Sequence, residues 1–84
     1  MEEKDEEKLI SIFKKTFATD DIDYIKNLKR EECIKWDSLA LVSMIAAISS
    51  DFSILIEPKY FEIFDSYDSI RKFIIDKKNN SKII

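Results

Sequence analysis

The chain has 84 residues, of which 45% are hydrophobic, and a formal net charge of −3. A chain of this length allows one domain with a small core, because folding removes only a little over half of its surface from water. It contains no histidine, no glycine and a single cysteine, which excludes an internal disulfide, the usual zinc sites, glycine-rich phosphate loops and nearly all catalytic triads.

Charge and hydropathy indicate a soluble protein of the cytoplasm. No apolar run approaches the roughly 20 residues that a membrane-spanning helix needs, and the acidic residues among positions 2–5 have the wrong charge for a secretory signal. Six acidic residues lie between Asp20 and Asp37, ahead of a basic end that begins at Arg71. A nucleic-acid-binding protein would usually carry the opposite balance. We therefore expect a cytoplasmic protein that binds neither membranes nor nucleic acids.

The first predicted element is a helix over residues 3–18. Leu9, Ile12, Phe13 and Phe17 recur at steps of three and four residues among charged side chains, which is the spacing of one helix face. Residues 19–36 lose this periodicity and are predicted to form a long loop with local turns. Because such a loop is uncommon in a compact domain, it either serves the function or contains a short helix.

A second helix is predicted from Leu39 to Ile48, where almost every side chain is apolar. Asp37 and Ser38, which precede it, are both good N-cap residues. The polar residues 49–51 weaken the helix, and alternating apolar residues over 52–56 indicate an extended connector. A strand is rejected there, because the sequence holds no second strand-like segment to pair with it.

Pro58 favours a short third helix over residues 58–64. Proline suits the first turn of a helix, because an N–H group at that position would have no partner and proline lacks one. Asp65 or Ser66 can cap a fourth helix, which starts near Tyr67 and should end near Lys77. The predicted fold is therefore all-α: a single domain over residues 1–84, with four helices, a long loop between the first two, and frayed ends at 1–5 and 78–84.

The segment most informative about function is Trp36-Asp37-Ser38-Leu39, where the long loop meets the apolar helix. A serine hydroxyl at this position lies beside free backbone N–H groups and the positive end of the helix dipole, which favour a phosphate diester. Taken alone, the position does not distinguish a modified serine from an ordinary N-cap, which is the commoner role.

The segment and its surroundings resemble the acyl carrier protein family, whose modified serine lies in an Asp-Ser-Leu motif at the start of the second helix. Apolar residues here also fall where that family places hydrophobic residues of its second helix and connector: Val42, Ile45, Ile48, Phe52 and Ile56. The first helix, the long acidic loop and the last two helices match as well. The resemblance covers residues 8–75 and implies a small four-helix bundle of acyl-carrier-protein type.

The resemblance implies that a phosphopantetheinyl transferase moves 4'-phosphopantetheine from coenzyme A to Oγ of Ser38. The flexible arm would end in a thiol that holds acyl groups as thioesters for acyl-activating and acyl-transferring enzymes. Asp37 matches an acidic neighbour that helps to dock the transferase and its magnesium ion, a role that is compatible with capping the helix. The chain itself would be a monomer with no catalytic residue and no metal site, serving a dedicated biosynthetic pathway such as fatty acid or secondary metabolite synthesis.

The second helix departs from the family pattern in charge. In the fatty-acid-synthesis members its exposed face is acidic, whereas Ser43, Ser49 and Ser50 occupy the corresponding positions here. Electrostatic steering toward basic partner surfaces should therefore be weaker at this face.

Two roles are open for Leu39, Val42 and Ala46 on the same helix. A helix that is apolar nearly all round is normally buried, which would make these three residues part of the core. Alternatively, they form an exposed apolar strip for partner recognition. Leu39 is the strongest candidate for exposure, because it directly follows Ser38.

A second function fits the same sequence: an unmodified small helical interaction module, in which Ser38 is only an N-cap and the apolar second helix binds another protein or a second copy. An independent enzyme has little support, because the usual combinations of nucleophile and base are missing. Cys33 is expected to be a half-buried loop residue without a catalytic role, and the phenylalanines are expected to form the core.

Overall fold

The computed structural model describes residues 2–83, and the side chains of residues 2–78. Over this range the chain is all-α, as predicted, with helices α1 (Glu3–Phe17), α2 (Ile22–Lys26), α3 (Ser38–Phe52) and α4 (Tyr67–Ile83). Two 3-10 helices, η1 (Arg30–Glu32) and η2 (Pro58–Ile63), lie between them. Residues 2–83 contain no strand, and their only β-type pairing is an isolated antiparallel bridge between Lys29 and Ser66.

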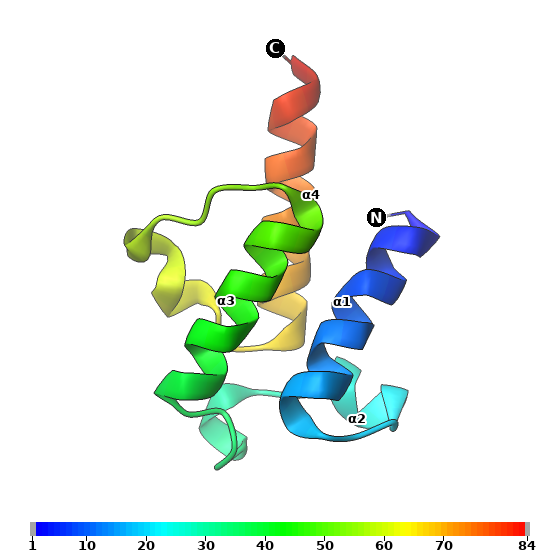
Figure 1. Cartoon of the computed structure of the whole chain (residues 1–84), viewed down its shortest axis with the longest axis vertical. Coiled ribbons are helices and arrows are strands. Elements are labelled where there is room, and N and C mark those ends of the chain that lie inside the picture. Colours follow the sequence, from blue (N-terminus) through cyan, green and yellow to red (C-terminus); the bar gives the residue numbers. More distant parts are fainter. Residues whose placement is uncertain (1, 84) are drawn as a thin grey trace.

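The core lies between α1, α3 and α4. Figure 1 shows α1 and α3 side by side, with α4 passing behind them and α2 below the C-terminal end of α1. The largest fully buried side chains come from every part of this arrangement: Leu9, Phe13, Ile25, Met44, Ile48, Phe64, Ile70 and Ile74. No helix formed by residues 2–83 has the length and hydropathy to cross a membrane.

Helix α1 confirms the prediction made from its periodicity. Leu9, Ile12, Phe13 and Phe17, the four residues that marked one face, are all buried. Acidic side chains lie in the first turn of α1 and lysines in the last, an arrangement that opposes the helix dipole at both ends.

The ends of α1 and α3 are unusual because the chain has no glycine. Ala18 and Ser53, the residues that follow these helices, adopt left-handed conformations with φ of 52° and 53°. Glycine is the usual residue at such a position, because a Cβ atom there costs roughly 1–2 kcal/mol. The two helix ends are therefore sites of local backbone strain.

The long segment 19–36 contains a short helix, which was one of its two predicted explanations. The Asp21 side chain accepts a hydrogen bond from the Tyr24 N–H at 3.1 Å and so caps α2, whose Ile25 is fully buried. Further along, the Arg30 N–H donates to the Asp65 carbonyl at 2.7 Å. The segment is thus packed onto the helices rather than looped into solvent.

Helix α3 is longer than predicted. It runs through the polar residues 49–51 to Phe52, so the expected weakening there is wrong. Burial of Phe52 explains the extension, because its ring packs beneath the Lys8 ammonium, which also donates to the Asp51 carbonyl at 3.4 Å. The connector that follows alternates as predicted, with Ile56 buried and Leu55 exposed. The predicted third helix is present as η2, in 3-10 rather than α form.

Helix α4 starts as predicted but ends later. The Ser66 hydroxyl accepts the Ser69 N–H at 3.0 Å and caps the helix, which continues past the expected end at Lys77 to Ile83. Lys78 donates a hydrogen bond to the buried carboxylate of Asp5 and so joins α4 to α1. Residues 3–5 and 78–83, within the ends predicted to fray, lie inside α1 and α4, while residues 1 and 84 lie outside the described range.

Candidate functional site

Trp36 anchors the loop that leads into α3. Its side chain is only 3% exposed, and its ring meets Phe13 edge-on, with centroids 5.8 Å apart, and Phe17 at 5.4 Å. The Trp36 N–H donates to the Cys33 carbonyl at 3.0 Å, which closes a turn over residues 33–36. Because Phe13 and Phe17 belong to α1, the loop is held to the core two residues before Ser38.

Asp37 is the N-cap of α3, so Ser38 is the first helical residue. The Asp37 Oδ1 atom accepts a hydrogen bond from the Ala40 N–H at 2.9 Å, and the Asp37 carbonyl accepts one from the Leu41 N–H at 3.0 Å. Either Asp37 or Ser38 could have capped the helix on sequence grounds, and the structure assigns that role to Asp37.

The hydroxyl of Ser38 is therefore not used as a cap, and the side chain is exposed. The backbone N–H groups of Ser38 and Leu39 belong to the first turn, where helix geometry provides no partner carbonyl. With the positive end of a 15-residue helix beside them, they make the surroundings of the Ser38 oxygen favourable for an anionic group. This geometry suits a phosphate diester on that oxygen.

One face of α3 is buried and the other is exposed. Leu41, Met44, Ile45, Ile48 and Phe52 form the buried face, which packs against α1 and the rest of the core. Leu39 is 78% exposed and Val42 58% exposed, and Ala46 is exposed as well. The interpretation of Leu39, Val42 and Ala46 as core residues is therefore wrong, because the helix has enough other apolar residues to fill the core.

Ile34 is an exposed apolar residue that the sequence did not identify. It lies at the tip of the turn closed by Cys33 and Trp36, and it is 99% exposed. The order of the residues alone does not show this, because Ile34 and Trp36 are two large apolar residues on the same short segment. Packing of the Trp36 ring against α1 decides which of them is buried.

Cys33 is half-buried, as predicted. Its Sγ atom lies 3.9 Å from the hydroxyl of Tyr24, a contact that joins the turn to α2. This contact is also the main cause that raises the pKa of Tyr24. With this raised pKa the Tyr24 hydroxyl stays protonated at neutral pH, so it cannot take the proton of the Cys33 thiol and offers no activation of it.

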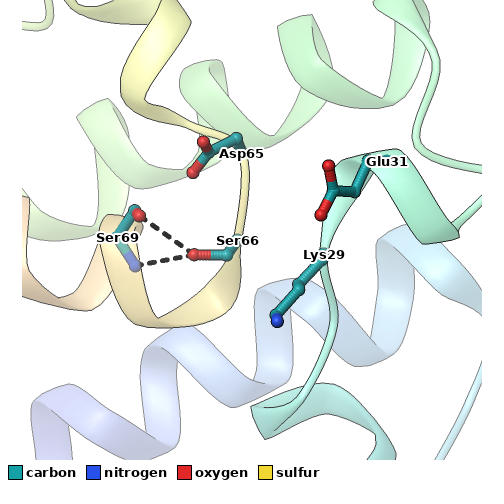
Figure 2. Close-up of a pocket in the computed structure, with 5 residues that line it drawn as sticks. All are labelled: Lys29, Glu31, Asp65, Ser66 and Ser69. Carbon is teal, nitrogen blue, oxygen red and sulfur yellow. Dashed lines mark hydrogen bonds between the residues drawn. The ribbon is translucent and has the colours of Figure 1, made fainter.

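A pocket of about 280 Å³ lies between residues 29–31, which lead into and include part of η1, and the start of α4 (Figure 2). It is lined by Lys29, Glu31, Asp65, Ser66 and Ser69. The Ser66 hydroxyl donates to the Ser69 hydroxyl at 2.9 Å while it caps α4, so its role is structural. The pocket shares no residue with α3, and the side chains that the structure describes form no cluster of three or more Cys, Asp or Glu that could hold a metal ion.

Comparisons of the chain with protein-family models, with curated proteins and with solved structures each give no match. The class of protein that residues 2–83 define is thus a small all-α protein. Its candidate site is an exposed serine at the start of an apolar helix, with a tightly anchored loop before it.

Proposed function

We propose that this chain is an acyl carrier protein, a single non-catalytic carrier domain of the four-helix type with 4'-phosphopantetheine attached to Ser38. The observation that supports this proposal most is the exposure of Ser38 as the first residue of α3, with its hydroxyl free of a capping role. A transferase needs such access, because the oxygen must reach the phosphate of coenzyme A. An ordinary N-cap serine would instead bond to its own helix.

The residues around Ser38 fit the attached group. The free N–H groups of the first turn and the helix dipole favour the phosphate, and Asp37 caps the helix while its exposed carboxylate also serves the docked transferase and its magnesium ion. When bound, the phosphopantetheine supplies a thiol that carries acyl groups as thioesters. The chain's own part is to hold the attachment point at the surface on a rigid helix.

In this proposal all chemistry takes place on partner enzymes. A phosphopantetheinyl transferase loads Ser38, and acyl-activating and acyl-transferring enzymes of a biosynthetic pathway in the cytoplasm use the arm. The carrier itself acts as a monomer.

The proposal is tested by incubating the full chain with coenzyme A and a broad-specificity phosphopantetheinyl transferase, followed by intact mass spectrometry. We expect the mass to rise by one phosphopantetheine, and Ser38→Ala to block the addition. Ser43→Ala is the matched control, because Ser43 is an exposed serine on the same helix and its replacement should leave the addition unchanged. An unmodified wild-type chain would refute the proposal.

A second candidate function, an unmodified interaction module, is favoured by one observation: the exposed apolar residues Leu39 and Val42 on α3. In such a module these side chains would bind another protein or a second copy without any attached group. Light scattering over a range of concentrations distinguishes the two candidates. Association of the unmodified chain at rising concentration supports the module, whereas a monomer at all concentrations argues against self-association.

A further inference from the structure

Three exposed apolar side chains lie within four residues of Ser38 along the chain, and we call them the apolar collar: Ile34, Leu39 and Val42. They are 99%, 78% and 58% exposed. Ile34 lies four residues before Ser38, so the Cα atoms of Ile34 and Ser38 can be at most about 15 Å apart. Leu39 follows Ser38 directly, and Val42 lies four residues on, which places it on the same face of α3 one turn away.

Single exposed hydrophobic residues are common on protein surfaces. A group of three within four residues of the same serine is not explained in that way. Ile34 is the most informative of the three, because the turn that carries it buries Trp36 and half-buries Cys33. The fold thus places the Ile34 side chain in water, four residues before Ser38, while Trp36 of the same turn anchors the loop.

The segment of α3 that carries Leu39 and Val42 has no charged side chain. No ionisable side chain occurs from Ser38 to Ser50, and the nearest charged residues in the loop, Lys35 and Asp37, have opposite signs. By contrast, five acidic residues lie between positions 20 and 32, on and around α2 and η1. A charged partner side chain placed over α3 would lose its water without meeting a counter-charge, which disfavours such a partner.

We propose that a protein docking at Ser38 covers the apolar collar with an uncharged apolar surface, and that burial of Ile34, Leu39 and Val42 holds it there rather than ionic attraction. This inference rests on the proposed function, because the transferase that modifies Ser38 is a partner that must dock at this surface. The absence of charge on α3 between Ser38 and Ser50 is the reason for expecting an uncharged partner surface, because only such a surface can cover this helix without burying an unpaired charge.

The test measures KM and kcat for modification of the full chain by a broad-specificity phosphopantetheinyl transferase with coenzyme A. Ile34→Ser and Leu39→Ser each remove one collar side chain, and Leu55→Ser is the matched control. Leu55 is 77% exposed, nearly the same as Leu39, but lies in the connector after α3. We expect KM to rise at least about fivefold for the two collar variants, the size of effect of a contact that contributes to docking, and to stay unchanged for Leu55→Ser.

Salt provides the second readout. Raising sodium chloride from about 0.05 M to about 0.5 M should change kcat/KM less than about threefold, because screening acts on ionic steering and not on apolar burial. A fall of about tenfold or more over this range, or equal KM values for Leu39→Ser and Leu55→Ser, would overturn the inference while leaving Ser38 modified and the proposed function intact. A wild-type chain that is never modified would refute the proposed function and the inference together.

Discussion

Replacement of Trp36 tests how the loop before Ser38 is held. The indole is buried against Phe13 and Phe17, yet its Nε1–H has no hydrogen-bond partner. Trp36→Ala removes both the packing and the buried donor. Trp36→Phe keeps an aromatic ring in the same place and removes only the donor and part of the ring surface, so comparison of the two variants separates the two effects.

The expected magnitudes differ clearly. Truncation of a buried tryptophan to alanine lowers the free energy of unfolding by about 3–5 kcal/mol, a large part of the roughly 4–13 kcal/mol expected for a chain of this size. For Trp36→Phe, the smaller ring costs about 1–2 kcal/mol in lost burial and residual cavity. Removal of an unsatisfied buried N–H returns about 1–3 kcal/mol. We therefore expect a net change in the free energy of unfolding between a loss of about 1 kcal/mol and a gain of about 2 kcal/mol.

Urea unfolding followed by far-ultraviolet circular dichroism measures both variants, since Trp36 is the single tryptophan and its fluorescence is lost with it. The rate of Ser38 modification, measured on folded protein, should fall for Trp36→Ala and stay near wild type for Trp36→Phe. A loss of about 2 kcal/mol or more in Trp36→Phe, the full cost of the smaller ring, would show that the buried N–H carries no penalty. A loss below about 1 kcal/mol in Trp36→Ala would show that the indole does not anchor the loop.

Two further predictions concern stability. Ala18→Gly should raise the free energy of unfolding by about 1 kcal/mol, because glycine adopts the left-handed conformation at this position without strain. The control Ala46→Gly, within α3, should lower the free energy of unfolding by a similar amount. Urea unfolding that shows no gain for Ala18→Gly would contradict the assignment of strain. Burial, together with the nearby carboxylate of Glu6, raises the pKa of Tyr67 from 10.0 to about 12. Because the unfolded chain then releases this proton at lower pH than the folded chain, stability should fall as pH rises from about 10 to about 12, and Tyr67→Phe should make this fall less steep in a pH series of urea unfolding curves.

Several elements of the structure could be predicted from short-range patterns. The polar residues around Leu9, Ile12, Phe13 and Phe17 mark the exposed side of α1, so the buried side follows from spacing alone. The helix start near Ser38 follows equally from local chemistry, because a capping residue immediately precedes an apolar run. Ser38 became the candidate site residue from this local pattern and from the family resemblance together.

Other features depend on contacts between distant residues. The extension of α4 beyond Lys77 accompanies the bond between Lys78 and Asp5, which lie 73 positions apart in the chain. The extension of α3 to Phe52 depends on burial against Lys8. No pattern within either helix contains this information.

The exposed side of α3 is the clearest case in which the sequence alone does not predict which residues are buried. Spacing identifies a buried face only where polar residues mark the opposite one, and α3 is apolar on both sides. The sequence by itself therefore determined that a helix starts next to this serine, and it left open whether Leu39 and Val42 are buried or exposed. Only the tertiary structure decided their exposure, because the space between α1 and α4 holds one face of α3, and the residues that this face contributes leave the other apolar face in water.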